Sequence, residues 1–168
     1  MEEKDRFPIF AVGGQVDRKT QLLSLCVEAI ERNGWRYRRE EGKDVLVMQM
    51  GLKTKLKECR VVVLCDDRCI SVYAVSMVSA GPDVRPTIAE FITRANYGLR
   101  IGNFEMDYRD GEVRYKAVLD CLDRLPAPKE VDQVIITPVA MLEKFGDGLA
   151  KALFGFGEPE ADVQKAKG

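Results

Sequence analysis

The chain has 168 residues, of which 46% are hydrophobic and 32% are charged, with 26 Lys and Arg against 27 Asp and Glu. This composition is enough for one apolar core, argues against a membrane protein, and gives no general electrostatic attraction to nucleic acid or anionic lipid. The sequence contains no histidine, which excludes Ser-His-Asp and Cys-His nucleophiles and the commonest zinc ligand. Catalysis by carboxylates, Lys or Tyr is the enzymatic chemistry that remains.

The first 17 residues show no secondary-structure period, and Gly13-Gly14 interrupts the apolar run that starts at Phe7. We expect residues 1–17 to form a flexible arm. The arm has no apolar segment of signal-peptide length, and no run in the chain approaches the ~20 residues that span a bilayer. Because the five cysteines are an odd number and no export signal precedes them, we expect a cytoplasmic protein with reduced thiols.

A helix is predicted from about Arg18 to Asn33, because apolar residues recur on one face at 3.6-residue spacing. Asp17 or Thr20 can cap the start of this helix through a side-chain oxygen. Gly34 can end it in the left-handed conformation.

Four strands are predicted next, joined by connections short enough for an antiparallel sheet. Their ranges are about 35–40, 45–50, 60–65 and 69–78. The third strand is β-branched, and we expect it to be central or buried on both faces. A second helix is predicted to begin near Pro86, since proline is favoured in the first helical turn, and to end between Asn96 and Gly98.

Asp110-Gly111 is typical of a two-residue β-hairpin turn, which would fix the register of the strands on either side. The predicted cross-strand pairs are Arg109–Glu112, Tyr108–Val113, Asp107–Arg114, Met106–Tyr115, Glu105–Lys116 and Phe104–Ala117. One face of this hairpin would carry matched charges and the other face apolar side chains. A slip of one residue would turn the whole apolar set outward.

The last helical region is predicted from about Val131 to Leu153, and Pro138 either kinks it or divides it into two helices. We expect residues 18–154 to form a single domain and residues 155–168 to form a disordered tail. The predicted fold class is α+β, with an antiparallel sheet and three main helices.

Few constellations of residues suggest chemistry. Cys59, Cys65 and Cys69 are close in sequence, but the spacing is not that of a Cys-x-x-Cys pair, so we expect buried structural cysteines, no metal and no cofactor. No glycine-rich segment lies between a strand and a helix with a following Lys-Ser or Lys-Thr, which argues against a phosphate loop. The paired carboxylates of Asp66-Asp67 and Glu40-Glu41 lie in predicted turns.

The segment Trp35-Arg36-Tyr37-Arg38-Arg39 alternates aromatic and basic side chains. Such a pattern is found on nucleic-acid-binding surfaces, where bases stack on aromatic rings. It is equally typical of an amphipathic strand whose aromatic residues face inward and whose arginines face outward. We consider nucleic-acid binding the less favoured interpretation.

The sequence from Phe91 to Leu99 (FITRANYGL), followed by GNFEMD at 102–107 and DGEVRYK at 110–116, resembles the YbjN family of bacterial sensory transduction regulators. The shared pattern is a helix ending in Asn, a G-x-F-x-x-D strand, a D-G turn and a strand with an Arg. The order of elements over about residues 18–154 also fits. That family is similar in fold to type III secretion chaperones, which pack helices against an antiparallel sheet and are usually dimeric.

The resemblance implies a non-enzymatic, homodimeric regulator that captures a protein or peptide partner on apolar helix surface or on an exposed strand edge. No set of functional residues carries over from the family. Because Phe91 and Tyr97 lie on or just after the second helix, we expect them to belong to the partner or dimer surface. The main alternative is a small-molecule sensor with a pocket between sheet and helices, while an enzyme would need converging polar groups that the sequence does not suggest.

Overall fold

The computed structural model describes residues 16–40 and 43–168. The predicted flexible arm, residues 1–17, therefore lies almost entirely outside the described residues. The predicted fold class is confirmed, since the protein is α+β and every pair of neighbouring strands is antiparallel. None of the helices described is both long and apolar enough to cross a membrane.

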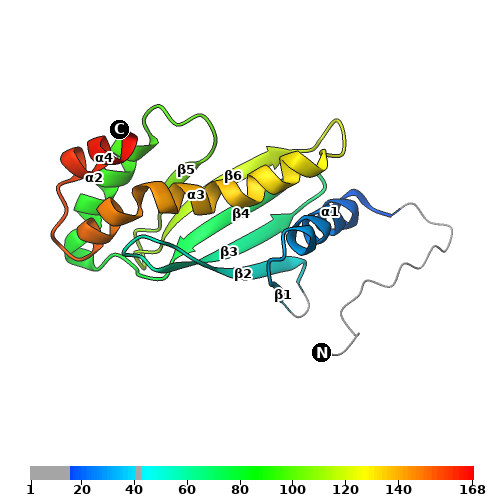
Figure 1. Cartoon of the computed structure of the whole chain (residues 1–168), viewed down its shortest axis with the longest axis horizontal. Helices are drawn as coiled ribbons and strands as arrows, with labels where there is room; N and C mark the ends of the chain where they lie inside the picture. Colours follow the sequence, from blue (N-terminus) through cyan, green and yellow to red (C-terminus); the bar gives the residue numbers. More distant parts are fainter. Residues whose placement is uncertain (1–15, 41–42) are drawn as a thin grey trace.

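Six strands form one sheet in the order β1-β2-β3-β4-β6-β5, accompanied by four α-helices (Figure 1). The bounds are α1 Arg18–Arg32, β1 Arg38–Arg39, β2 Val45–Gly51, β3 Glu58–Cys65, β4 Cys69–Ser76, the 3-10 helix η2 Pro82–Val84, α2 Arg85–Asn96, β5 Asn103–Met106, β6 Val113–Asp120, α3 Pro128–Leu153 and α4 Pro159–Lys167. The strand predicted at 35–40 is shortened to β1, because the Trp35 N–H bonds to the Ile30 carbonyl at the end of α1 (3.0 Å) rather than to a strand.

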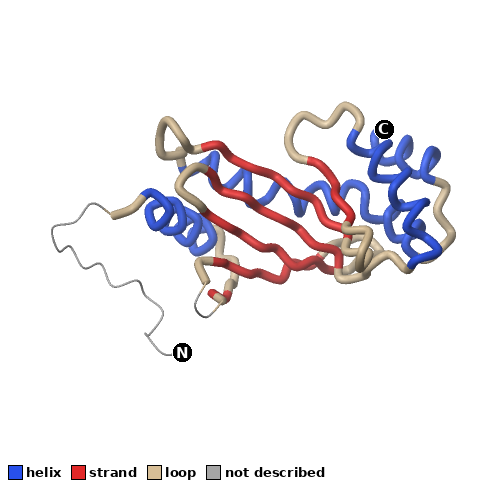
Figure 2. Tube along the Cα trace, turned by 180° about the vertical axis from the view of Figure 1, so that it is seen from behind, coloured by secondary structure: helices blue, strands red, loops and turns tan. Residues whose placement is uncertain are grey.

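The sheet has one face under helices and one open face. α3 runs along the sheet against β4 and β6, and α1 packs against α3 and β3 (Figure 1). Seen from behind, the strands lie in front of α3, and no described helix crosses them (Figure 2). β3 is central as predicted, but its residues alternate between buried and more exposed. It is therefore buried on its helix-facing side alone.

α1 begins at its predicted cap. The Asp17 carboxylate accepts a hydrogen bond from the Thr20 N–H at 2.9 Å, which satisfies a backbone donor of the first turn. Gly34, with φ of +70°, follows the last turn in the left-handed conformation. The helix buries one apolar face, made by Leu22, Leu23, Cys26, Val27, Ala29 and Ile30.

α3 passes without interruption through Pro138. Of the two predicted alternatives, division into two helices is wrong. Pro138 is itself buried, so its ring adds apolar packing although it lacks a backbone N–H.

An aromatic cluster connects β5, β6 and α3. The Phe104 ring meets Tyr115 and Phe145 edge-to-face at centroid distances of 4.9 and 5.6 Å.

The β5–β6 hairpin differs from its predicted register by two residues. The observed pairs are Asn103–Lys116, Phe104–Tyr115, Glu105–Arg114 and Met106–Val113. Residues 107–112 therefore form a wider turn than the predicted two-residue loop. Because the shift is even, the apolar set keeps its face, except that Tyr108 leaves the strand and is 55% exposed.

The wider turn follows from its packing against the chain after β4. The Ala80 N–H donates to the Gly111 carbonyl at 2.8 Å. A Cβ on Gly111 would lie 2.0 Å from the Ala80 carbonyl oxygen, and Gly111 has φ of +77°. Only glycine allows this approach of two backbones. The contact holds residues 107–112 in a wider turn than the Asp110-Gly111 dipeptide alone predicts.

The prediction of a disordered tail at 155–168 is wrong for residues 159–167, which form α4. α4 packs on α2 and α3 and buries Val163. The Asp162 carboxylate, also buried, accepts a hydrogen bond from the Lys151 Nζ at 2.6 Å. The segment is polar in composition and was therefore predicted to be disordered. Its helix is held by these two contacts with other helices, which the local sequence does not reveal.

Candidate functional site

The two residues predicted for a partner or dimer surface lie in different environments. Phe91 is completely buried, with its ring close to Gly148 of α3. Its assignment to a surface is therefore wrong, because the apolar stripe of α2 faces the core. Tyr97, just after α2, is 84% exposed, and its carbonyl accepts a hydrogen bond from the Lys167 Nζ at 2.6 Å. Since the structure does not bring the two side chains onto one surface, Tyr97 alone remains a prediction.

The open face of the sheet combines apolar and cationic side chains. The strand register places Val47, Gln49, Arg60, Val62, Tyr73, Val75, Arg114 and Lys116 in its central rows. Long side chains lie over the apolar ones: the Arg114 guanidinium is 4.5 Å from the centroid of the Tyr73 ring, a cation–π distance. The face is thus partly covered by its own arginine and lysine side chains.

One edge of the sheet, β5, is closed by a side chain. The Asn96 amide at the end of α2 accepts a hydrogen bond from the Phe104 N–H (2.7 Å) and donates one to the Phe104 carbonyl (3.0 Å). These are the two bonds that a neighbouring strand would make with Phe104. The Lys167 Nζ donates to the carbonyls of Arg94 and Tyr97 on either side of Asn96, so α4 braces the end of the helix that closes this edge.

The opposite edge, β2, is mostly uncovered. β1 pairs with β2 at two positions, Leu46 and Val47. In an antiparallel strand, successive residues direct their backbone groups to opposite edges. Two bonds fix this alternation, from the Glu40 N–H to the Val45 carbonyl and from the Leu52 N–H to the Lys57 carbonyl. The outward set therefore includes Gln49 and Gly51, and no strand of the described chain lies opposite them.

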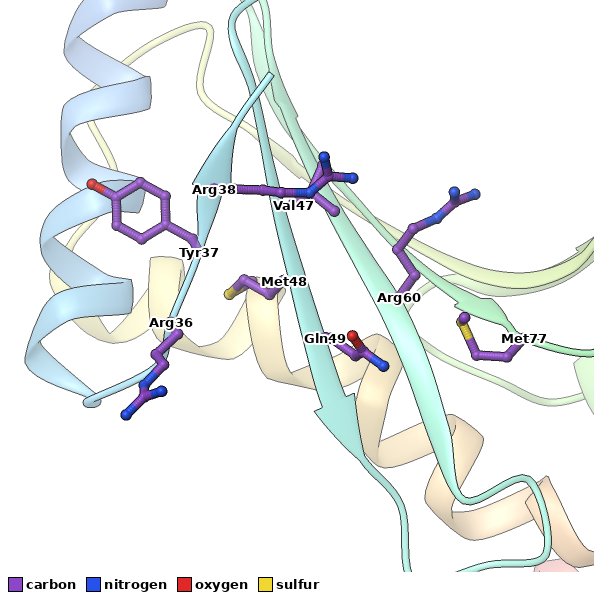
Figure 3. Close-up of a pocket in the computed structure, with 8 residues that line it drawn as sticks. All are labelled: Arg36, Tyr37, Arg38, Val47, Met48, Gln49, Arg60 and Met77. Carbon is purple, nitrogen blue, oxygen red and sulfur yellow. The ribbon is translucent and has the colours of Figure 1, made fainter. Parts of the chain in front are cut away.

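A groove of about 500 Å³ opens beside this edge (Figure 3). It is lined by Arg36, Tyr37, Arg38, Val47, Met48, Gln49, Arg60 and Met77. Arg38 extends across Val47, whereas Tyr37 points toward α1 (Figure 3), where its hydroxyl lies 3.5 Å from the Glu31 carboxylate. Trp35 and Tyr37 both pack against the core, as the amphipathic-strand interpretation predicts.

The groove has more positive charge than its surroundings neutralise. Arg36 and Arg38 form no ion pair with any residue in the described ranges, and Arg60 lies 3.5 Å from the Glu112 carboxylate. Elsewhere on the sheet the cations have close partners: the Glu105 carboxylate lies 2.9 Å from the Arg114 Nε and 2.6 Å from the Lys116 Nζ. The groove is therefore suited to a negatively charged ligand.

A second hollow lies at the β5–β6 turn, where the carboxylates are held by cations. Burial raises the pKa of Glu105, but the Lys116 and Arg114 side chains outweigh burial and hold that pKa below its ordinary value. Hydrogen bonds from Arg109 lower the pKa of Asp107 to about 2. Carboxylates that stay ionised and paired at neutral pH are poorly suited to general acid or base catalysis. Both hollows open at the rim of the sheet, and neither lies between the sheet and α3.

Four of the five cysteines, Cys26, Cys59, Cys65 and Cys121, are buried, and Cys69 is partly exposed. The Cys26 and Cys65 sulfurs lie 3.8 Å apart in the core between α1 and β3, and their hydrogen bond and burial raise the pKa of the Cys26 thiol. Burial raises the pKa of Cys59 to about 12. Thiols with raised pKa values are weak nucleophiles at neutral pH. In the described part of the chain, no three His, Cys, Asp or Glu side chains are grouped as metal ligands.

Comparison with known proteins identifies the family of this chain. Residues 27–151 match the family model YbjN, described as "Putative bacterial sensory transduction regulator". The chain belongs to the YbjN family. A solved structure, "Crystal structure of YbjN, a putative transcription regulator from E. coli", is 11% identical, covers 70% of this chain and 91% of its own, and has a TM-score of 0.47. The search of curated proteins gave no match.

The YbjN match contains all six strands and Asn96, and it stops before α4. Sequence patterns identified Arg36 and Arg38 as outward-facing residues, but they did not identify the groove. The missing information was the strand order. β4 pairs with β6 rather than with β5, which follows it in sequence, and this order leaves β5 at one edge of the sheet and β1 and β2 at the other. Asn96 was interpreted as a helix end alone, and nothing local to it indicates that its amide reaches Phe104.

Proposed function

We propose that this member of the YbjN family is a non-enzymatic, cytoplasmic regulator that captures an extended segment of a protein partner along the outer edge of β2. The observation that carries the proposal is the absence of a described strand opposite the outward backbone groups of Gln49 and Gly51. A segment in extended conformation would continue the ladder with main-chain hydrogen bonds and place alternate side chains in the adjoining groove. A regulator that acts by binding agrees with the description of the family.

The chemistry of the described side chains supports binding rather than catalysis. The sequence has no histidine. The most enclosed carboxylate of the β5–β6 rim, Glu105, is held by Arg114 and Lys116, and burial keeps the Cys59 thiol protonated at neutral pH. None of these groups combines a matched pKa with an open position next to a second catalytic side chain.

The test uses a proline that blocks the edge without disturbing the sheet. The Gln49 N–H points away from β3, so Gln49→Pro removes an outward donor and keeps the β2–β3 ladder. Gln49→Ala is the matched control, since it loses the same side chain and keeps the N–H. We expect proteins captured from a native cell extract by the wild-type and Gln49→Ala chains, and identified by mass spectrometry, to be lost with Gln49→Pro.

Circular dichroism and a urea midpoint close to that of wild type would establish that the Gln49→Pro chain is folded. If the folded Gln49→Pro chain captured the same proteins as Gln49→Ala, strand addition at β2 would be wrong.

We further propose a homodimer, with Tyr97 in the dimer or partner surface. Tyr97 is the most exposed of the large apolar side chains described, at 84%, and such a residue is frequent at protein interfaces. Sedimentation of wild type and Tyr97→Asp would test this, with Tyr108→Asp as a control because Tyr108 is also exposed. We expect a dimer that dissociates with Tyr97→Asp alone; a wild-type monomer, or a Tyr97→Asp dimer, would contradict the proposal.

A further inference from the structure

The groove beside β2 also indicates what kind of segment it binds, and this inference rests on the function proposed above. Three arginines line the groove, Arg36, Arg38 and Arg60. The side chains of Arg38 and Arg60 lie over β2 and β3, and that of Arg36 points away from them (Figure 3). Val47 and Met77 supply apolar surface within the groove. An occupant must therefore combine charge complementary to arginine with side chains that pack on an apolar floor.

Arg36 and Arg38 differ from neighbouring cations because they have no ion-pair partner among the described residues. Arg39, next to Arg38, forms an ion pair with Asp44, and Lys43 lies 3.4 Å from Glu40. Arg36 and Arg38 have no carboxylate within ion-pair distance among the residues described, and Arg60 has a single long contact of 3.5 Å to Glu112. Glu58, which lies opposite Gly51 in the register of β2 and β3, accepts a hydrogen bond from the Gln49 side chain at 2.6 Å.

The geometry of strand addition determines where ligand side chains go. A strand added to β2 would lie about 4.8 Å away and direct alternate side chains to the two faces of the sheet. Arg38 lies opposite Val47 on the open face, and Arg60 lies opposite Gln49 on the same face. The side chain that the added strand places beside Gln49 on this face would thus meet guanidinium groups, which bind carboxylates through paired hydrogen bonds. The next row on this face, that of Gly51, holds Glu58 instead.

We propose that the β2 groove selects an acidic, extended protein segment with Asp or Glu in the part that lies beside Gln49 and the three arginines, and with apolar residues next to them. The carboxylates contact Arg36, Arg38 and Arg60, and the backbone pairs with Gln49 and Gly51. Nucleic acid is the rival ligand because arginine also binds phosphate. It fits less well, since Trp35 does not line the groove and the ring of Tyr37, which does, points toward α1 (Figure 3) rather than into the groove as a stacking platform for bases.

The experiment starts with the full chain and random dodecapeptides displayed on phage. We expect the selected sequences to be enriched in Asp and Glu together with apolar residues. Synthetic copies would then be compared with versions in which every Glu and Asp is replaced by Gln and Asn. Fluorescence anisotropy should show at least ten-fold weaker binding for the amide versions, and weaker binding of the acidic peptides as salt is increased.

The matched variants are the pair Arg36→Gln with Arg38→Gln, and the control pair Arg100→Gln with Lys129→Gln, which removes two exposed cations outside the groove. The first pair should weaken binding of the acidic peptides about ten-fold or more, and the control pair should leave it within two-fold. Equal binding of acidic and amide peptides would overturn the charge selection and leave strand addition at β2 intact. Selection of no peptide at all would overturn both proposals.

Two further probes distinguish other occupants. Tighter binding of single-stranded oligo-dT than of any peptide, with the same loss on Arg36→Gln and Arg38→Gln, would assign the groove to nucleic acid and overturn the inference. A synthetic peptide of residues 1–15 contains Glu2, Glu3 and Asp5. If it bound more tightly than the selected peptides with the same arginine dependence, the occupant would be the protein's own N-terminal segment rather than a partner.

Discussion

The two edges of the sheet are treated in opposite ways. At β5, the Asn96 amide makes both hydrogen bonds that a further strand would make with Phe104. At β2, the two-residue β1 stops at Val47, and a groove with arginine walls takes its place. An exposed strand edge invites unwanted pairing between chains. One closed edge and one edge left open beside a charged groove therefore agree with the proposal that the β2 edge binds a partner segment.

The largest expected effect comes from opening the closed edge. Asn96→Ala removes both hydrogen bonds to the backbone of Phe104, whose side chain is buried. We expect the free energy of unfolding in urea to fall by about 2–3 kcal/mol. Hydrogen exchange at the Phe104 amide should become faster in the same variant, because its acceptor is gone.

Asn96→Asp is the matched control for this prediction. The aspartate can still accept from the Phe104 N–H, but it cannot donate to the carbonyl, so the loss of stability should be smaller than for alanine. Equal stability of wild type and Asn96→Ala would show that the β5 edge does not depend on this amide.

The second effect acts on the closed edge through α4. Burial raises the pKa of Asp162, but hydrogen bonds from the Lys151 side chain and the Glu158 N–H outweigh it and hold the pKa below its ordinary value of 3.8. A carboxylate with a lowered pKa in the folded state stabilises the fold above its unfolded pKa, and this contribution is lost as the pH falls through the folded value. We expect Asp162→Asn to cost about 1–2 kcal/mol at pH 7.

The same linkage predicts a pH dependence. The difference in unfolding free energy between wild type and Asp162→Asn should shrink as the pH falls from 6 to 3, because wild type then loses its own carboxylate contribution. A difference that stayed constant over this range would mean that the charge of Asp162 does not hold α4.

How far the sequence predicts this molecule depends on whether the relevant contact is local. The cap at Asp17 and the apolar stripe of α1 depend on neighbours along the chain, and they were predicted correctly. The β5–β6 register was wrong by two residues, because Gly111 docks on the distant Ala80. Phe91 was misplaced for a related reason, since an apolar helix stripe does not reveal whether another element covers it.

A smaller effect is expected at the brace between α4 and α2. The Lys167 Nζ donates to the carbonyls of Arg94 and Tyr97 at the end of α2, where a positive charge is favourable. Lys167→Met keeps most of the side chain's length and removes the charge, and should cost about 0.5–1 kcal/mol. Exchange at the Phe104 amide should accelerate slightly. If Asn96→Ala and Lys167→Met effects added without coupling, α4 would not support the closed edge.

An effect of similar size but opposite sign is expected at Gly51 on the open edge, where glycine is not required by the backbone. Gly51 does not have a positive φ, and a Cβ there would meet a single backbone oxygen at the ordinary distance of 4.0 Å. Gly51→Ala should therefore raise the free energy of unfolding by about 0.5–1 kcal/mol, because the unfolded chain loses freedom. Glycine within a strand often marks a position where another backbone approaches closely, and in the proposed complex the backbone beside Gly51 is that of the bound segment. Gly51→Val should then stabilise the fold yet weaken binding of the selected peptides, whereas tighter or unchanged peptide binding would place the ligand away from this end of β2.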